Sequence, residues 1–289
     1  MRLCRFAEDR FGVVRGDQVF DVSAALTALS YHYPLPRFDP LIAHLAKLRA
    51  DIEGHADQTA GRPLAEVGLA SPVANPGKII AAPVNYRKHL EEARADATIH
   101  HQKQIDEIQR VGLFLKATSS VVGPSQGVAI RHPDRRTDHE IELAVVIGRP
   151  ADRVSARNAL DYVAGYCIGL DITVRGPEER SLRKSIDSYT VLGPWVVTSD
   201  ELPDPSNLDL TLTVNGEIRQ KANTRDLIIG IADLIAFASS FYTLMPGDVL
   251  LTGTPEGVAP IQAGDVMTAT IAGIGSMDIG VRAIDAPRS

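Results

Sequence analysis

The stretch 138–148, which reads DHEIELAVVIG, limits the possible folds more than any other part of the sequence. Side chains alternate between the two faces of a strand, so Glu140 and Glu142 would share one face, about 7 Å apart. Ala144 and Val146 continue that face as apolar residues, which places the two acids at the edge of a buried surface, where unpaired charge is costly. We predict a buried strand that begins with two convergent carboxylates. A solvated strand face is the alternative reading of this stretch alone.

A third acid, Asp171, closes the apolar run Tyr162–Leu170 at the expected end of another strand. A turn or cap carboxylate is the alternative for this position. Three carboxylates offer the hard oxygen ligands that Mg²⁺ and Mn²⁺ prefer, and three protein ligands leave positions open for water and a chelating substrate. The pattern indicates a catalytic metal site.

Short apolar runs bounded by Gly and Pro dominate the second part of the chain and predict strands. These are expected at Lys78–Ala82, Glu140–Ile147, Tyr162–Val174, Trp195–Thr198, Leu208–Val214, Val249–Thr252 and Val266–Ile271. Helices are expected at Tyr86–Ala95, Gln102–Arg110, Ala156–Leu160 and Leu227–Tyr242. The fold class that follows is α+β, dominated by strands.

The first part of the chain is expected to form a small N-terminal α/β cap domain over residues 1–70. Short apolar pieces separated by turn residues predict hairpins there, followed by helices at Ala24–Leu29 and Leu41–Leu48. The regular spacing of apolar residues is lost over Asp51–Gly77, so we place a linker at about residues 65–76 and the main domain at 76–289.

Composition excludes several classes of function. The formal net charge of −6 and the sequence pI near 5.8 provide no basic stripe for nucleic acid. No stretch approaches the roughly 20 apolar residues of a membrane span, and no secretory leader is indicated. Cys4 and Cys167 are far apart in apolar surroundings, which supports neither a disulfide framework nor a cysteine metal site. A cytoplasmic protein is therefore expected.

A series of ordered motifs resembles the fumarylacetoacetate hydrolase family over roughly residues 76 to 282. The motifs are Asn85–His89, Glu140–Gly148, Gly165–Arg175, Lys184–Asp187, Leu192–Trp195, Val214–Glu217 with Gln220, and Pro246–Pro255. The resemblance implies a mixed β-sandwich roll as the catalytic domain, and the N-terminal unit looks like the small domain of many prokaryotic members. It also implies a homodimer with one Mg²⁺ or Mn²⁺ per subunit at Glu140, Glu142 and Asp171.

Catalytic roles follow from the same resemblance. His89 and Glu92 are three residues apart in an expected helix, which brings them to one face. An imidazole oriented by a carboxylate is a suitable base for water near neutral pH, so the family pattern assigns His89 as base and Glu92 as its partner. A surface histidine is the alternative. Lys184 would help to neutralise a developing enolate. The alternative is that Lys184 is an exposed lysine in a loop.

The residues expected to contact substrate are Tyr86, Lys116, Arg175, Glu178 and Thr254. Thr254 would offer a hydroxyl and nearby backbone N–H groups to a substrate carboxylate; a simple Gly-Pro turn is the alternative. Glu178 stands where a substrate-facing Gln is usual in the family. A carboxylate there should repel an anionic group, which predicts a substrate with a neutral or cationic distal end.

The segment Ala95–Arg110 is more polar than the Pro-rich link common in the family and is expected to form a lid. His100 and His101 lie within it. Adjacent side chains point apart and no nearby acid completes a ligand set, so a solvated lid is favoured over a metal site.

These features predict a divalent-metal-dependent hydrolase that cleaves a carbon–carbon bond in a small 1,3-dicarbonyl or acylpyruvate substrate through a stabilised enolate. Two further enzymes would use the same enolate-forming half of the site: a decarboxylase of oxaloacetate-type 2-oxo acids and an isomerase of 2-hydroxy-diene-dioates. A non-catalytic small-molecule binding protein is the alternative from another class. The Gly-rich pieces Gly253–Gly257 and Gly273–Gly275 lack the context of a nucleotide loop, so no organic cofactor is implied.

Overall fold

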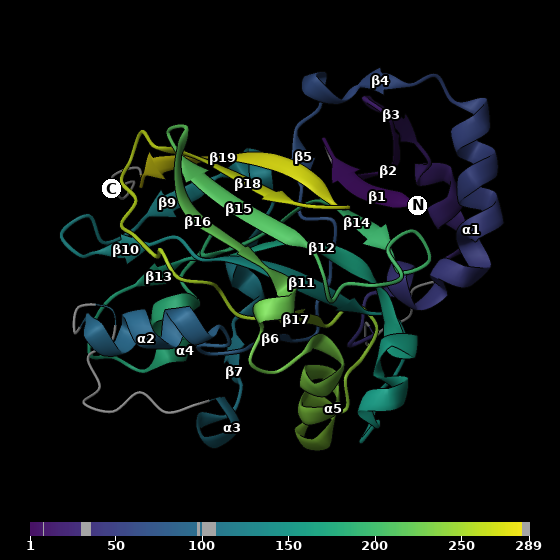
Figure 1. Ribbon diagram of the computed structural model, residues 1–289. Coiled ribbons are helices and arrows are strands. Elements are labelled where there is room, and N and C mark those ends of the chain that lie inside the picture. The colour runs from purple at the N-terminus through teal and green to yellow at the C-terminus, as the bar shows by residue number, and fades with distance from the viewer. Residues whose placement is uncertain (8, 30–35, 97–98, 100–107, 285–289) are drawn as a thin grey trace.

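The computed structural model describes residues 1–7, 9–29, 36–96, 99 and 108–284. Within them, twelve strands form one large sheet, five form a second sheet and two form a short ribbon. Figure 1 shows the second sheet lying across the large one. The predicted strand-dominated α+β fold is confirmed.

The large sheet mixes antiparallel and parallel pairs. Its central path runs in the order β4 (Arg62–Pro63), β3 (Gln18–Asp21), β2 (Arg10–Arg15), β1 (Arg2–Phe6), β14 (Thr190–Thr198), β12 (Val163–Asp171), β11 (Ile141–Ile147), β17 (Val249–Leu251), β6 (Ile79–Ala81) and β7 (Phe114–Lys116). Off this path, β5 (Leu69–Ala70) pairs with β1, and β8 (Val121–Val122) pairs with β14.

The smaller elements complete the architecture. The second sheet has the order β16 (Glu217–Asn223), β15 (Asp209–Val214), β18 (Val266–Ile271), β19 (Gly275–Ala283) and β9 (Val128–Ile130), and the ribbon joins β10 (Thr137–Asp138) to β13 (Thr173–Val174). The α-helices are α1 (Pro40–Gln58), α2 (Arg87–Ala95), α3 (Ile108–Val111), α4 (Arg180–Lys184) and α5 (Ile231–Phe241). None of the described helices is long and apolar enough to cross a membrane.

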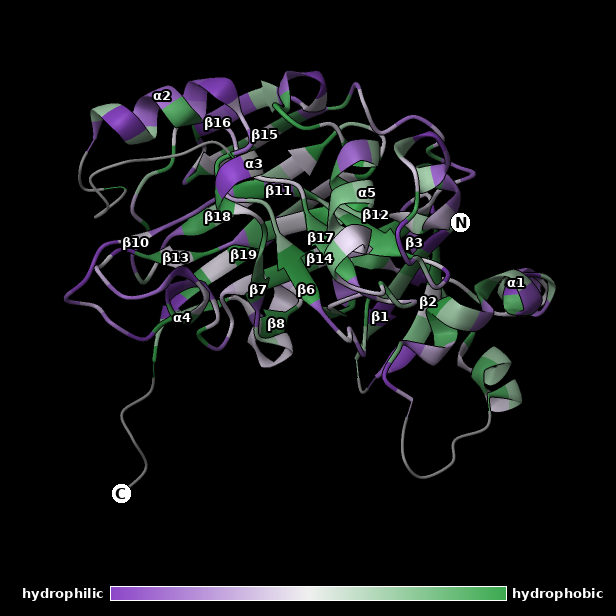
Figure 2. Cartoon of the chain, turned by 90° about the horizontal axis from the view of Figure 1, so that it is seen from below, coloured by the Kyte–Doolittle hydropathy of each residue, from purple (hydrophilic) through white to green (hydrophobic). Residues whose placement is uncertain are grey.

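Strand β11 is buried on both faces, which explains its continuous apolar sequence. Leu143 and Val145 pack into the core between the two sheets, while Ala144 and Val146 pack into a separate cluster on the other side. In Figure 2 the strands β14, β17 and β6 of the same sheet are strongly hydrophobic, whereas α2 is largely hydrophilic. The acids predicted to bind a metal thus lie on or next to one of the most deeply buried strands of the molecule.

The N-terminal segment continues the large sheet. Strand β1 pairs with β14 in antiparallel register, Arg2 opposite Val197 and Leu3 opposite Val196. Helix α1 covers a small core of its own, which includes Phe11 and Ile52. The division into domains at residues 70 and 76 stays a prediction.

Several elements differ from the sequence-based expectation. Helix α1 is longer than the predicted Leu41–Leu48: the Asp39 side chain accepts a hydrogen bond from the Ile42 N–H at its start, and the helix runs on through a polar stretch to Gln58. The segment Ala156–Tyr162 is a 3₁₀ helix. Strands β16 and β19 were not expected, because exposed polar residues interrupt their apolar pattern.

Candidate metal centre and active site

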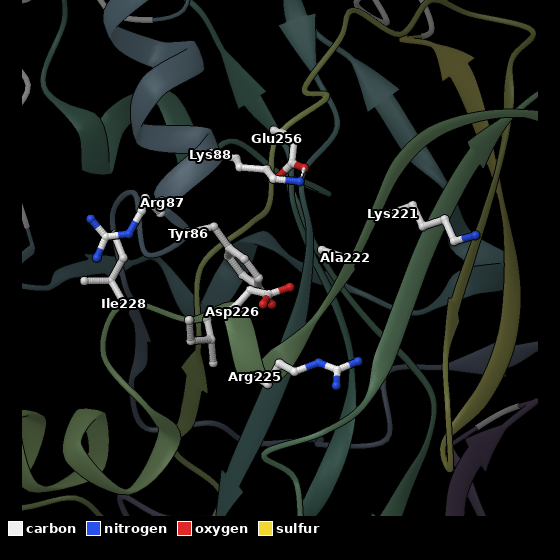
Figure 3. Close-up of a pocket in the computed structure, with 10 residues that line it drawn as sticks. Tyr86, Arg87, Lys88, Lys221, Ala222, Arg225, Asp226, Ile228 and Glu256 are labelled. Carbon is white, nitrogen blue, oxygen red and sulfur yellow. Dashed lines mark ion pairs between the residues drawn. The ribbon is translucent and has the colours of Figure 1, made fainter.

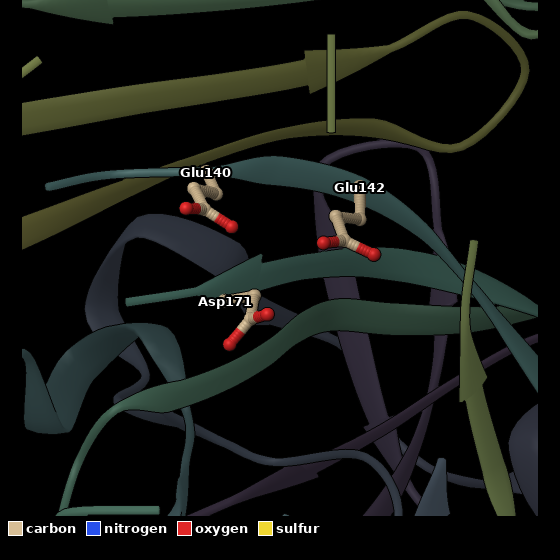
Figure 4. Close-up of side chains that lie close together, drawn as sticks. All are labelled: Glu140, Glu142 and Asp171. Atoms are coloured by element: carbon tan, nitrogen blue, oxygen red, sulfur yellow. The ribbon is translucent and has the colours of Figure 1, made fainter. Parts of the chain in front are cut away.

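Three carboxylates converge where β11 begins and β12 ends. Ile141 lies opposite Leu170, and the Asp171 N–H donates to the Glu140 carbonyl over 2.9 Å, which locks the two chain segments in register. One oxygen of each of Glu140, Glu142 and Asp171 lies within 4.8 Å of the others. All three side chains are buried and point toward one another (Figure 4).

Two lysines and an arginine surround this cluster. Lys184 Nζ donates to Glu140 Oε2 and to Asp171 Oδ2, each over 2.7 Å. Lys116 Nζ donates to the other oxygen of Asp171, and Arg175 Nη2 donates to Glu140 Oε1 over 2.9 Å. Burial by itself would raise the pKa of Glu140, but Lys184 and Arg175 hold it well below its ordinary value.

Glu142 has a different environment from the other two acids. Its Oε2 accepts a hydrogen bond from the Gly253 N–H over 2.6 Å. Within the described part of the chain, no lysine or arginine forms an ion pair with it. Burial raises the pKa of Glu142 well above its ordinary value, and the charge of Asp171 adds to the effect. A divalent cation among the three acids would remove this penalty, so the donor set fits Mg²⁺ or Mn²⁺.

His89 and Glu92 form a hydrogen-bonded pair on the inner face of α2. His89 Nδ1 lies 2.9 Å from Glu92 Oε2, and Glu92 Oε1 accepts from the Gly257 N–H over 3.0 Å. The imidazole is only 3% exposed. Because the carboxylate holds Nδ1, the remaining ring nitrogen Nε2 is the one free for proton transfer.

Thr254 is fixed by a buried amide. Gln220 Nε2 donates to Thr254 Oγ1 over 2.8 Å, while Gln220 Oε1 accepts from the Ile141 N–H and contacts His139 Nδ1. The hydroxyl of Thr254 therefore accepts from the protein and keeps its own proton available for a ligand.

A small cavity joins these groups. Its lining includes His89, Glu140, Glu142, Lys184 and Thr254, together with Arg175, Arg180, Ala82, Pro83 and Val84. Its volume of about 20 Å³ matches roughly one water molecule, so a substrate needs the walls to move apart. Val84 has a φ of 30°, an unusual conformation for a β-branched residue, and such strain is often found at functional sites.

Arg180 was missed by the sequence reasoning. It lies on α4 one turn before Lys184, and only its position between two recognised motifs could have drawn notice.

Three of the predicted substrate contacts, Tyr86, Lys116 and Glu178, lie outside the lining of this cavity. Glu178 forms two hydrogen bonds with Arg135, at 3.0 and 2.7 Å, so its charge is matched and the expected repulsion of an anionic substrate has no structural basis. Tyr86 lines a separate cleft of about 480 Å³ between the start of α2 and residues 221–228, where Lys88 pairs with Glu256 (Figure 3).

Lys116 lies beneath Asp171 and donates to the Tyr189 carbonyl as well. Two of the three donors of its ammonium are thus engaged by protein acceptors. His100, His101 and most of the predicted lid lie outside the described residues, as does most of the helix predicted at Gln102–Arg110.

The arrangement of acids, lysine and histidine can be compared with known proteins. The family described as fumarylacetoacetate (FAA) hydrolase C-terminal matches residues 78–282. The chain belongs to the fumarylacetoacetate hydrolase family. Maleylpyruvate hydrolase of Aquipseudomonas alcaligenes is 58% identical over 287 residues, covering 98% of this chain and 100% of the relative.

Solved structures of this family show the same fold over the whole chain. Maleylpyruvate hydrolase of Sphingobium sp. SYK-6, in complex with manganese(II) ion and pyruvate, is 40% identical with a TM-score of 0.84, covering 99% of this chain and 100% of that one. A 5-carboxymethyl-2-hydroxymuconate delta-isomerase from Mycobacterium smegmatis is 32% identical with a TM-score of 0.72 and the same coverage.

These findings confirm the sequence-based predictions of family, fold class and a metal-dependent hydrolase. The roles of single residues in this member of the fumarylacetoacetate hydrolase family stay predictions.

Proposed function

We propose that this protein hydrolyses maleylpyruvate, or a closely related acylpyruvate, to pyruvate and the corresponding carboxylic acid. The observation that carries the proposal is the single cavity that His89 shares with Glu140, Glu142 and Lys184. A water-activating base and a site for a leaving enolate are the two parts that such a hydrolysis needs. The 58% identity to a maleylpyruvate hydrolase supports this choice of substrate.

Glu140, Glu142 and Asp171 would hold one Mg²⁺ or Mn²⁺ ion. When bound, the ion would polarise the 2-oxo group of the substrate and stabilise the charge of the pyruvate enolate. Lys184, within 2.7 Å of two of these acids, adds a second positive charge beside that enolate.

His89 and Glu92 carry the water-dependent half of the reaction. His89 Nε2 takes a proton from water, and the oxygen of that water forms a bond to the distal carbonyl carbon. The bond from that carbon to the neighbouring methylene then breaks, and its electron pair leaves on the pyruvate enolate. The proton on His89 returns to the methylene carbon, which becomes the methyl group of pyruvate. Glu92 keeps the ring in the required tautomer throughout.

The remaining predicted contacts have unequal support. Arg175 and Thr254 line the cavity, and the Thr254 hydroxyl is free to donate to a substrate carboxylate. Lys116 acts through Asp171, which it pairs with directly. Tyr86 and Glu178 would reach substrate only after α2 and the cavity walls move.

An isomerase of the same family is the second candidate, because a delta-isomerase is 32% identical to this chain. An isomerase or a decarboxylase needs the enolate site but no activated water. The hydrogen-bonded His89–Glu92 pair is therefore what favours hydrolysis.

The test is product analysis with metal-loaded protein offered maleylpyruvate, acetylpyruvate and oxaloacetate. We expect equal amounts of pyruvate and maleate from maleylpyruvate, and a loss of 10²-fold to 10⁴-fold in His89→Gln but not in the α1 control His44→Gln. CO₂ from oxaloacetate without acid products would establish a decarboxylase instead. No turnover of any substrate would favour a binding role.

We further propose that the protein is a cytoplasmic homodimer. Cys4 and Cys167 are buried free thiols, which suits a reducing compartment, and Phe241 on α5 is 69% exposed, which suits a contact surface. Light scattering of the eluting protein gives the subunit number directly; a monomer at micromolar concentration would contradict the dimer.

A further inference from the structure

Arg180 lies in the same cavity as the proposed catalytic groups. It stands four residues before Lys184 on α4, so both side chains project from one face of the helix. Both cations also lie over the ring of Phe114, the guanidinium carbon at 5.4 Å and the lysine nitrogen at 5.6 Å from the centroid. The ring holds Arg180 beside the cavity without neutralising it.

The other formal charges near the cavity balance in number: four buried carboxylates, Asp138, Glu140, Glu142 and Asp171, lie with four cations, Arg136, Arg175, Lys184 and Lys116. The cations pair with Asp138, Glu140 and Asp171, while Glu142 has no ion-pair partner among the described residues. Arg180 stands outside this balance. In the described residues it forms no ion pair or hydrogen bond with any carboxylate. A divalent ion at the acids would add to the positive excess.

An unmatched cation in a partly buried position is costly. Burial lowers the pKa of Arg180, which reflects the loss of hydration by its guanidinium. A guanidinium can recover that cost by binding a carboxylate through two parallel hydrogen bonds. The cavity therefore provides an unused site for an anionic group.

The position of Arg180 suggests which anionic group it takes. The carboxylate next to the 2-oxo group of an acylpyruvate would lie beside the ion, where Lys184 and Arg175 are committed to protein acids. A second carboxylate at the far end of the acyl group would need a cation of its own. Glu178 does not oppose it, because Arg135 already pairs with that residue.

We propose that Arg180 binds the distal carboxylate of the substrate and thereby selects acylpyruvates whose acyl group ends in a carboxylate. This inference rests on the proposed function and specifies its substrate class. It reverses the expectation, drawn from Glu178, of a neutral or cationic distal group.

The first experiment compares maleylpyruvate with acetylpyruvate, which keeps the 2-oxo acid but has no distal carboxylate. In Arg180→Met we expect the KM for maleylpyruvate to rise about 10-fold to 100-fold, the usual effect of losing a hydrogen bond between charged groups, while kcat/KM for acetylpyruvate changes less than about twofold. Arg180→Lys should recover part of the loss. Arg131→Met, which removes the same charge from an exposed pair with Asp187, is the control.

Equal losses for both substrates would overturn the inference, because Arg180 would then serve the shared 2-oxo acid end. Unchanged kinetics for maleylpyruvate would overturn it as well.

The second experiment is independent of turnover. Calorimetric titration of the Mn²⁺-loaded protein with maleate, a cis dicarboxylate, and with isocrotonate, the cis monocarboxylate of the same carbon skeleton, measures recognition of the second carboxylate. We expect maleate to bind at least about tenfold more tightly, and the difference to vanish in Arg180→Met. If both calorimetric results are obtained but no acylpyruvate is hydrolysed, the proposed function is contradicted while the anion site at Arg180 is supported. If maleate binds Arg180→Met as tightly as the unsubstituted protein, the proposed anion site is contradicted, whether or not the protein hydrolyses acylpyruvates.

Discussion

At the scale of single residues, the three acids of the candidate metal centre are not equivalent. Lysines or arginines donate hydrogen bonds to Glu140 and Asp171, whereas among the described residues Glu142 accepts one only from the Gly253 N–H. The protein thus neutralises two of the acids itself and leaves Glu142 as a buried charge that burial disfavours. This is the residue whose ionisation depends most on a bound cation.

We predict that Glu142→Gln stabilises the metal-free protein. The folded-state pKa of Glu142 is raised, so ionisation costs the native state stability once the pH rises above the unfolded value near 4.5. The amide keeps the shape and accepts the same N–H. The free energy of unfolding of the variant should exceed that of the unsubstituted protein by about 1–3 kcal/mol at pH 8 in EDTA, as measured by urea denaturation.

This stability difference should shrink as the pH falls toward 4.5, where Glu142 is protonated in both states. With Mn²⁺ added, the unsubstituted protein should become more stable than Glu142→Gln, because only the carboxylate can serve as a charged ligand. A variant that is less stable than the unsubstituted protein at pH 8 in EDTA would contradict this explanation.

At the scale of elements, the site depends on the loop that follows β17 and contacts Glu92 on α2. Gly253, Thr254 and Gly257 follow β17 and supply contacts to Glu142, Gln220 and Glu92 in turn. Gly257 has a φ of 93°, and an added Cβ would lie 2.0 Å from the Arg219 carbonyl oxygen. Side chains are excluded there by both conformation and space.

We predict that Gly257→Ala lowers kcat by about 10²-fold, because a shift of this loop removes the donor that orients Glu92. Mn²⁺ affinity should change little, since Gly257 touches none of the three acids. Gly264→Ala is the matched control: its φ is 99°, but nothing lies within 4 Å of the added atom. Steady-state kinetics measures kcat and calorimetry measures Mn²⁺ affinity for both variants. If both lose activity equally, backbone strain alone would explain the loss and this prediction would be contradicted.

Local pattern explains what could be predicted from the sequence at this scale. Alternation along 138–148 was enough to place Glu140 and Glu142 together, because strand geometry fixes side-chain direction. The partner of Glu178 could not be found in this way, since Arg135 lies 43 residues away and meets it only in the folded chain. Strand β16 escaped notice because most of its side chains face solvent.

At the scale of the whole molecule, the N-terminal segment and the catalytic part share a sheet. Cys4, Phe6 and Val19 belong to the same hydrophobic cluster as Val145 on β11. The sequence could not reveal this, because strand pairing between residues 2 and 197 leaves no local signature.

We predict that the two parts unfold together, because separating them would break the pairing of β1 with β14 and expose shared core. Differential scanning calorimetry should show one transition, whose calorimetric and van't Hoff enthalpies agree for the folded unit. Two resolved transitions, with one lost after removal of residues 1–70, would instead support the domain boundary predicted from the sequence.

The central claim is that a divalent ion held by Glu140, Glu142 and Asp171 is required for acylpyruvate hydrolysis. The most direct measurement is titration of the metal-free protein with Mn²⁺, in which calorimetry reports binding and maleylpyruvate turnover reports activity over the same range of Mn²⁺ concentrations. Activity and binding should rise together and saturate at one ion per subunit, and Asp171→Asn should show neither. Full turnover by the metal-free protein, or an active Asp171→Asn variant, would contradict the claim.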